Sequence, residues 1–249
     1  MRVELPPILL TSSIVAMDQT VLLADQSLRI FHTLESLRRW LVISPDSHYV
    51  VCDGSDYDFS GLVREHFPGA KIECLHFRNE EVLVRFHGKG FGEGEIIKYA
   101  LENSEYLKTS QWFVKCTAKL WVENYFECLR EWNGTFLCKA FFSNVFSLSP
   151  VKLEYIDTRF YLVNKKFYQD NFIEAHIGIG GKKGVSIEDR FLAILLSGKF
   201  KHFLFRIPPT VCGVGGGSGR YYKNSIIRRA KERVRSLIPS SMTRYREFF

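Results

Sequence analysis

An acidic turn follows one of the most hydrophobic segments of the chain. Val50 and Val51 lead into Cys52-Asp53-Gly54-Ser55-Asp56, so a strand is expected to end where the polar residues begin. In an open parallel sheet, ligands bind at the carboxyl ends of the strands. A carboxylate there can accept a hydrogen bond from a nucleobase or a ribose, and a glycine lets the backbone approach a ligand. The structural alternative is an acidic turn in which Asp56 or Asp58 caps the next helix.

A second segment combines several glycines with a cation. Residues 86–95 read FHGKGFGEGE, with Lys89 among the glycines. We expect a loop in front of a helix, where backbone N–H groups and the helix N-terminus can hold a diphosphate. The segment matches neither a Walker loop nor G-x-G-x-x-G, and a flexible surface loop is the alternative.

Two carboxylates begin a predicted helix late in the chain. Glu188 and Asp189 follow Ser186 and Ile187. Either carboxylate can act as a general base if it lies within hydrogen-bond reach of a hydroxyl group. Ser186 and Asp189 also stand at the N-cap and N3 positions of a variant capping box, and both roles can hold together.

The elements that would position these residues alternate between strand and helix. Apolar runs predict strands at 8–14, 47–53, 71–77 and 112–116. Helical spacing predicts helices at 25–41, 59–67, 93–107 and 186–196. This alternation predicts an α/β, Rossmann-like fold in which helices flank a mostly parallel sheet. Between 135 and 161 we expect shorter, partly antiparallel strands.

The order of these features resembles the opening of family 2 glycosyltransferases, which have the GT-A fold. In that family a first strand and helix lead to a V-V-D-D-G-S-x-D turn that holds the nucleotide of a sugar donor. Here the matching turn is Val51–Asp56, and the resemblance continues through Pro68-Gly69-Ala70-Lys71-Ile72 and Asn79, over about the first 120 residues. It implies that the base or ribose of the donor is contacted by Thr11, Asp53, Gly54 and Ser55.

The same resemblance implies roles for the charged residues. It places the segment around Lys89 at the border of the donor site and makes Glu188 or Asp189 the general base of an inverting displacement. Where the GT-A pattern has a metal-binding Asp-x-Asp, this chain has Lys115 and Lys119. These lysines can neutralise a diphosphate directly, or they can merely flank the core. The departure indicates a metal-independent enzyme or a protein outside the family. No cofactor is assigned; Mg²⁺ or Mn²⁺ is the alternative, but its usual Asp-x-Asp site is missing.

Two further segments carry candidate donor contacts. Arg159 follows Asp157 and Thr158 before a predicted strand, where a salt bridge is the structural alternative. The glycine-rich segment 213–219 is either a linker or a loop that closes over the donor phosphates with Ser218 and Arg220.

The charge of the chain is unevenly distributed. Its 249 residues are 46% hydrophobic and carry 34 Lys and Arg against 27 Asp and Glu, a balance that excludes a disordered chain or a polytopic membrane protein. Residues 220–249 hold nine of the basic and two of the acidic residues, so residues 1–219 are neutral. We therefore expect a catalytic domain at 1–212, the glycine-rich segment at 213–219 and a basic tail at 220–249.

The tail predicts a basic amphipathic helix. Between 221 and 238, apolar residues recur on one helical stripe with Arg and Lys around it. Such a helix is typical of an anchor that lies on an anionic membrane surface. Nucleic-acid binding and packing against the body are the alternatives, and we expect no nucleic-acid partner.

The cysteines and the N-terminus bear on the cellular setting. The six cysteines show no C-x-x-C spacing and no zinc-ligand cluster with histidine. Neither a secretory signal nor a membrane span is recognisable in the sequence. We expect a cytoplasmic protein that is peripherally associated with the inner face of a membrane.

The resemblance and the tail together predict a function. The protein would transfer a sugar from a nucleotide-sugar donor to a lipid-linked or cell-surface glycan, of the lipopolysaccharide O-antigen or capsule type. The alternatives are a GT-A-like nucleotidyltransferase and a non-catalytic protein that binds nucleic acid or a membrane. The glycine-rich signature with Arg or Lys that such nucleotidyltransferases usually carry near the N-terminus is missing here.

Overall fold

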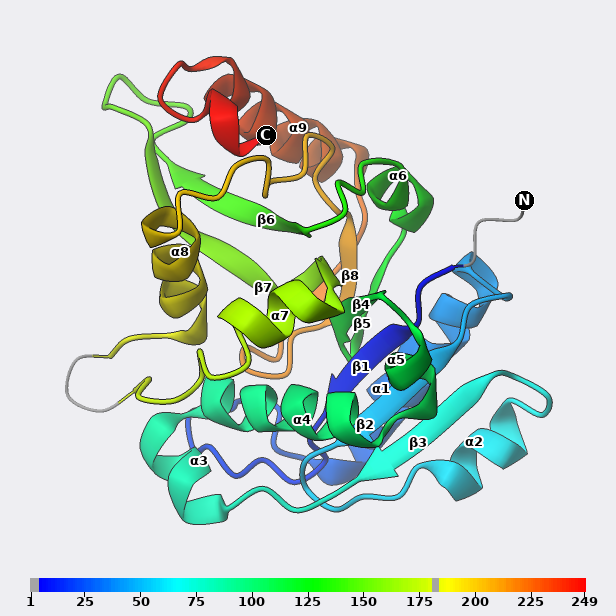
Figure 1. The fold of residues 1–249 in the computed structure, drawn as a ribbon. Coiled ribbons are helices and arrows are strands. Elements are labelled where there is room, and N and C mark those ends of the chain that lie inside the picture. The colour runs from blue at the N-terminus through cyan, green and yellow to red at the C-terminus, as the bar shows by residue number, and fades with distance from the viewer. Residues whose placement is uncertain (1–4, 181–183) are drawn as a thin grey trace.

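A six-stranded sheet, with strand order β3-β2-β1-β4-β7-β6, forms the centre of the protein (Figure 1). The computed structural model describes residues 5–180 and 184–249. The strands are β1 (Ile8–Ser12), β2 (Tyr49–Asp53), β3 (Ile72–His76), β4 (Trp112–Thr117), β6 (Phe136–Ser143) and β7 (Lys152–Asn164). Strands β1 to β4 pair in parallel, whereas β7 runs antiparallel to both β4 and β6. The predicted α/β fold with a mostly parallel sheet is confirmed.

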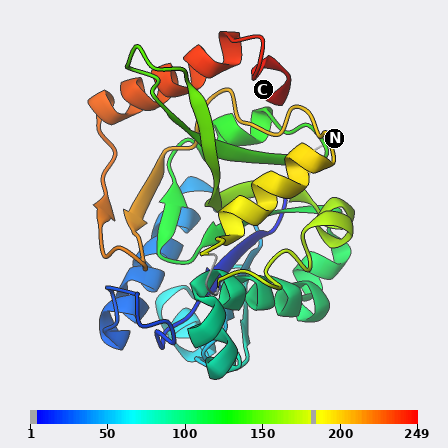
Figure 2. The same cartoon turned by 90° about the vertical axis from the view of Figure 1, so that its left-hand side faces the viewer.

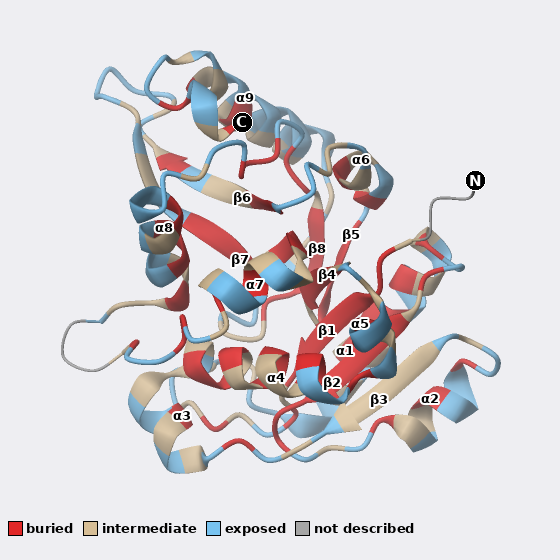
Figure 3. Ribbon diagram, in the orientation of Figure 1, coloured by how far each residue is buried: buried red, intermediate tan, exposed pale blue. Residues whose placement is uncertain are grey.

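Helices cover both faces of this sheet (Figures 1 and 2). One apolar cluster includes residues of α1 (Gln26–Ile43), α2 (Ser60–His66) and α6 (Tyr125–Arg130). The other includes residues of α3 (Glu81–His87), α4 (Lys89–Asn103), α5 (Glu105–Thr109), α7 (Lys165–Asn171) and α8 (Ile187–Ser197). Leu9 packs into the second cluster, whereas Ile8 and Leu10 pack into the first. Figure 3 shows these central strands buried, which is why they are continuous apolar runs in the sequence.

The segment between 135 and 161 is antiparallel, as predicted, but its strands are not short. Strand β7 has 13 residues and β6 has eight. The two strands form a hairpin with register shifts between Cys138 and Lys139 and between Phe141 and Phe142. These irregularities let a long two-stranded ribbon bend. The turn residues between 135 and 161 therefore belong to one bent hairpin and not to several short strands.

The glycine-rich segment 86–95 is not the loop that we predicted. Helix α3 ends at His87, Gly88 has φ +85°, and α4 begins at Lys89. A Cβ at Gly94 would lie 2.2 Å from His176 Cγ. A Cβ at Gly90 would lie 3.1 Å from Ile187 Cβ. The glycines therefore allow neighbouring side chains to pack against the first turns of α4, and this packing outweighs their poor helix propensity.

The second glycine-rich segment, 213–219, is a loop of the fold and not a linker. Gly213 and Val214 belong to β8 (Val211–Val214), which pairs with β5 (Leu120–Val122) and β9 (Tyr221–Tyr222) in a small antiparallel sheet. The turn at 215–220 connects β8 to β9 and is closed by a hydrogen bond from Gly215 N to Arg220 O at 2.9 Å. The boundaries expected at 212 and 220 therefore fall inside one small sheet.

The C-terminal residues are packed against the rest of the protein. Helix α9 (Ile226–Ser241) lies beside β6 at the top of Figure 1, and the 3-10 helix η2 (Arg246–Phe248) follows it. Tyr245 and Phe249 are buried members of the apolar cluster that contains α4 and α8. The predicted amphipathic helix is present, but residues 220–249 do not form a separate tail.

Candidate functional site

A cleft of about 450 Å³ opens at the carboxyl ends of β1 and β4. Six of the residues that the sequence marked as site candidates line it, namely Thr11, Lys89, Lys119, Arg159, Glu188 and Ser218. They come from β1, α4, the segment after β4, β7, α8 and the turn after β8. Residues from six distant parts of the sequence thus meet at the sheet edge where ligands of open α/β folds bind.

Three cations surround the glycine turn at one part of this cleft. Arg29 of α1, Lys89 and Lys119 all line it together with Gly215, Gly216 and Gly217. A Cβ at Gly216 would lie 3.1 Å from Lys119 Cε. A Cβ at Gly217 would lie 2.5 Å from Lys89 Nζ. Glycine at these positions therefore allows the turn to cover both lysines.

Two of these cations are held in an environment that disfavours their charge. Burial and the neighbouring Arg29 lower the pKa of Lys119 to about 7, although Asp53 and Glu93 act in the opposite direction. The guanidinium of Arg29 donates from Nε to Ser13 O and from a terminal nitrogen to Leu23 O, both at 2.7 Å. Such a cluster of desolvated cations is stabilised when an anion binds to it. Arg29 was missed in the sequence, where it is one of several charged residues of an amphipathic helix.

Three carboxylates line the same cleft, those of Asp18, Glu93 and Glu188. Asp18 Oδ2 accepts a hydrogen bond from the backbone N–H of Lys89 at 2.9 Å. Glu188 Oε1 accepts a hydrogen bond from Thr158 Oγ1 at 3.2 Å. Glu93 was not among the sequence candidates, although it lies in the glycine-rich segment. Its Oε1 accepts hydrogen bonds from Thr11 Oγ1 at 3.0 Å and from Lys115 Nζ at 2.5 Å. No sequence motif distinguishes Glu93 from Glu95, which lies two positions further on. Only the fold brings Lys115 to Glu93.

Lys115 does not reach the cleft as a phosphate ligand. Its side chain is fully buried beneath the cleft and pairs with Glu93. Lys115 Nζ also donates to Thr158 O at 2.8 Å. The role expected for Lys115 is therefore corrected: it neutralises and orients a cleft carboxylate. Of the two lysines that replace the Asp-x-Asp pattern, Lys119 is the one that lines the cleft, although its side chain is also buried.

The acidic turn after β2 supports the cleft from below. Asp53 is fully buried, and its carboxylate accepts hydrogen bonds from Ile14 N at 3.0 Å and Ser55 N at 2.8 Å. Ser55 Oγ in turn accepts from the backbone N–H groups of Ile14 and Val15. A Cβ at Gly54 would lie 2.4 Å from Asn79 Nδ2. None of these three candidates lines the cleft, so the turn anchors the loop after β1 in place of the direct donor contact that the resemblance implies.

The structure separates the two carboxylates at the start of α8. Asp189 Oδ2 accepts from Ser186 N at 2.9 Å, and Ser186 Oγ accepts from Asp189 N at 3.1 Å. This reciprocal capping box is the structural alternative stated above. Asp189 does not line the cleft, whereas Glu188 does. The candidate base is therefore Glu188.

Arg159 combines the salt bridge and the cleft position that were expected as alternatives. Its Nε and one terminal nitrogen donate to the two carboxylate oxygens of Asp157 at 2.8 and 2.6 Å. Burial alone would raise the pKa of Asp157, but the Arg159 guanidinium holds it below its usual range. Arg159 also lies over the ring of Tyr222, 5.0 Å from its centroid. Arg220, the last donor candidate, does not line the cleft, although its neighbouring Ser218 does.

The residues of the cleft do not suit a divalent metal. Within 5–180 and 184–249, no group of three His, Cys, Asp or Glu side chains could hold one. The position where the family pattern has its acidic ligands carries Lys115 and Lys119 instead. The cysteines are not reactive nucleophiles either, because burial raises the pKa of every one of them.

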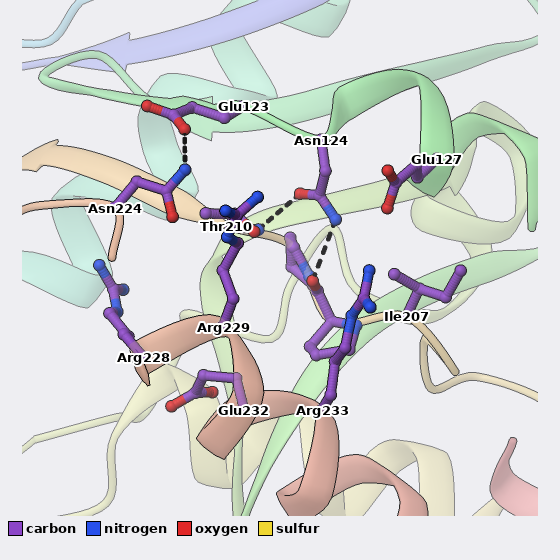
Figure 4. Close-up of a pocket in the computed structure, with 12 residues that line it drawn as sticks. Glu123, Asn124, Glu127, Ile207, Thr210, Asn224, Arg228, Arg229, Glu232 and Arg233 are labelled. Atoms are coloured by element: carbon purple, nitrogen blue, oxygen red, sulfur yellow. Dashed lines mark hydrogen bonds between the residues drawn. The ribbon is translucent and has the colours of Figure 1, made fainter. Parts of the chain in front are cut away.

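A second pocket, of about 210 Å³, lies between α6, residues 207–210 and α9 (Figure 4). Arg229 and Arg233 rise from α9 into it, and Glu127 lines it from α6. Asn124 holds its wall in place by accepting from Thr210 N at 2.6 Å and donating to Pro208 O at 3.2 Å. None of the site candidates lines this pocket. Because six of those candidates line the cleft instead, we place the candidate site in the cleft.

Comparisons with known proteins find similar solved structures at low sequence identity. No family model and no curated protein matches the sequence. A protein of Desulfovibrio desulfuricans described as a nucleotide-diphospho-sugar transferase is 9% identical, with a TM-score of 0.48 over 82% of this chain and 80% of its own. An active-site mutant of LgtC is 12% identical, with a TM-score of 0.46 over 80% of this chain and 71% of its own. HddC of Yersinia pseudotuberculosis, in complex with GMP-PN, is 13% identical, with a TM-score of 0.43 over 92% and 98%.

Proposed function

We propose that the protein is a glycosyltransferase of the GT-A type that uses a nucleotide-sugar donor. The observation that carries this proposal is the convergence of Arg29, Lys89 and Lys119 on the glycine turn in the same cleft as Glu188. A diphosphate carries the charge that such a cluster can neutralise. A free carboxylate in the same cleft is the group needed to activate a hydroxyl nucleophile.

The reaction that this arrangement supports is a single displacement. Glu188 takes the proton of an acceptor hydroxyl while the hydroxyl oxygen forms a bond to the anomeric carbon of the donor sugar. The bond between that carbon and the diphosphate oxygen breaks, and its electron pair leaves with the nucleoside diphosphate. The three cations stabilise the negative charge that develops on this leaving group. Attack opposite the leaving group inverts the configuration at the anomeric carbon.

The same cluster supports a reaction without a divalent metal. Lys119 stands where the family pattern has an acidic metal ligand, and Arg29 and Lys89 add positive charge beside it. An ammonium or guanidinium group can neutralise phosphate oxygens as a bound metal does, but it needs no acidic ligands. We therefore expect donor binding and turnover to persist in the presence of a chelator.

Helix α9 supports a membrane-bound acceptor, of the lipopolysaccharide O-antigen or capsule type. Ser236 and Pro239 are buried, and Glu232 pairs with Lys139 of β6. The opposite face carries apolar side chains that are exposed, with Ile226 at 78% and Leu237 at 63%. These buried and exposed positions fall on opposite sides of a 3.6-residue helix.

Basic residues border this exposed apolar stripe of α9 on both sides. Arg229 and Arg233 lie along one edge and Lys231 along the other, as the helical repeat places them. Lipid headgroups of negative charge complement such edges, and the stripe between them can enter the acyl boundary. No helix in the described part of the chain is long and apolar enough to cross a membrane. The exposed stripe and its basic edges are the grounds on which we propose surface docking through α9.

A donor panel tests the proposed activity. Nucleotide sugars carrying uridine, guanosine, thymidine or cytidine are incubated with the protein in EDTA, and binding and nucleotide release are measured. Saturable binding of at least one donor, with slow release of its nucleotide, is the expected result. Absence of binding to every member overturns the proposal. A nucleotidyltransferase would instead release pyrophosphate from a nucleoside triphosphate and a sugar 1-phosphate, and this is measured in parallel.

A further inference from the structure

Glu93 is a carboxylate of the cleft that the displacement described above does not use. It lies on α4, its side chain is 23% exposed, and it lines the cleft. A carboxylate repels phosphate oxygens, so the part of a ligand that faces Glu93 is not the diphosphate. It must instead carry hydrogen-bond donors.

The two oxygens of Glu93 are in different surroundings. Oε1 accepts from Thr11 Oγ1 at 3.0 Å, from Lys115 Nζ at 2.5 Å and from Thr117 Oγ1 at 3.4 Å. No hydrogen bond to Oε2 is found among the described residues. Three donors therefore fix the orientation of the carboxylate and leave its second oxygen available to a ligand.

A chain of hydrogen bonds links Glu93 to the proposed base. Lys115 Nζ bonds both Glu93 Oε1 and Thr158 O, and Thr158 Oγ1 bonds Glu188 Oε1 at 3.2 Å. Glu93 thus belongs to the part of the cleft where the base acts, which in the proposed reaction is the anomeric centre of the sugar. The hydroxyls nearest to that centre are those of the transferred sugar.

We propose that Glu93 Oε2 accepts a hydrogen bond from a hydroxyl group of the transferred sugar and so selects the donor; this rests on the proposed function. Lys115 supplies the counter-charge that keeps a carboxylate at this place. A site built to bind a hydroxyl discriminates against a donor that lacks it, because the site oxygen then remains unpaired. Glu93 is therefore a specificity-determining residue, distinct from the base.

The test compares the affinity for a nucleotide sugar with that for its nucleoside diphosphate. Glu93→Gln alone leaves the buried Lys115 without a counter-charge and can fail to fold. The working variant is therefore Glu93→Gln combined with Lys115→Met, with Lys115→Met alone as the matched control. Circular dichroism and thermal unfolding show whether each variant is folded, and the donor is the one that binds best in the panel.

The expected result is a selective loss of the contribution of the sugar to binding. The wild type should bind the nucleotide sugar about 10-fold tighter than the nucleoside diphosphate, and the double variant should bind the two equally. Lys115→Met should retain most of the difference. Equal loss of affinity for both ligands, together with lost discrimination against the 2′-deoxy nucleotide, would place Glu93 at the ribose and overturn the proposal. An unchanged ratio in the double variant also overturns it. If the wild type binds no nucleotide at all, the proposed function itself fails.

Discussion

Lys115 Nζ lies 2.5 Å from Glu93 Oε1, and the lysine is fully buried whereas the carboxylate reaches the cleft. A buried ammonium depends on its partner, because it cannot recover its hydration in place. A carboxylate at the cleft surface can be solvated when its partner is removed. The two halves of this ion pair are therefore not equivalent.

The different burial of Lys115 and Glu93 gives the first prediction. Glu93→Gln should lower the free energy of unfolding by about 3 kcal/mol, and Lys115→Met by about 1 kcal/mol, since only the first leaves a buried charge unpaired. Urea denaturation of both variants measures the difference. The double variant should be less destabilised than the sum of the single variants. A larger loss for Lys115→Met than for Glu93→Gln would contradict this assignment.

The separation of Glu188 from Asp189 gives the second prediction. Glu188→Gln should lower kcat by about 100-fold or more with little change in donor affinity, because the variant cannot accept the acceptor proton. Asp189→Asn is the matched control, since it alters only the capping box at the same helix start. It should leave kcat unchanged and lower the free energy of unfolding by about 1 kcal/mol or less. If the two kinetic effects were exchanged, Asp189 would be the base.

The low pKa of Lys119 predicts how stability changes with pH. The lysine has a pKa of about 7 in the folded protein against 10.5 in the reference state. The unfolded chain therefore binds more protons between these values, and stability should rise with pH in that window. Between pH 7 and 8.5 the titration of Lys119 should raise the free energy of unfolding by about 2 kcal/mol. This rise should be missing in Lys119→Met. Urea denaturation at each pH gives the free energy of unfolding of the wild type and of Lys119→Met. Subtracting one from the other cancels the titration of the groups that both proteins share. A constant difference over this range would contradict the burial of a charged Lys119.

The exposed stripe on α9 gives the fourth prediction. Ile227→Asp combined with Leu237→Asp should abolish sedimentation with vesicles that contain phosphatidylglycerol, because two charges enter the apolar stripe. Val42→Asp is the control, since Val42 is equally exposed but lies on α1. Neutral phosphatidylcholine vesicles should bind the wild type weakly. Sedimentation of the stripe variant at the wild-type level would show that α9 is not the docking surface.

The fold was largely predictable because burial leaves a direct trace in the sequence. The runs around Leu9, Val50 and Val114 are apolar on both sides, as strands between two helical layers must be. The glycines of residues 88–94 were misinterpreted as a loop, because their reason lies in distant partners such as His176 and Ile187. Local pattern carries no information on those partners.

The candidate site was predictable only in part. Thr11 and Lys119 were candidates through the resemblance to the GT-A pattern, and Glu188 also through its place at the start of a helix. The structure brings the three to one cleft. Arg29 and Glu93 were missed, because their importance comes from neighbours more than 15 positions away in the sequence. Asp53 was assigned to the ligand, but its carboxylate accepts hydrogen bonds from a backbone N–H group of its own turn and from another in the loop after β1.

Nucleotide binding in the presence of EDTA tests the central claim, that cations of this cleft hold a diphosphate without a metal. Calorimetric titration of uridine and guanosine diphosphates into the wild type and Lys119→Met is the direct measurement. We predict that the wild type binds at least one of them equally well with EDTA or with Mg²⁺. We also predict that Lys119→Met weakens this binding about 10- to 100-fold. Binding that appears only when Mg²⁺ or Mn²⁺ is added, or that is unchanged in Lys119→Met, would contradict the account.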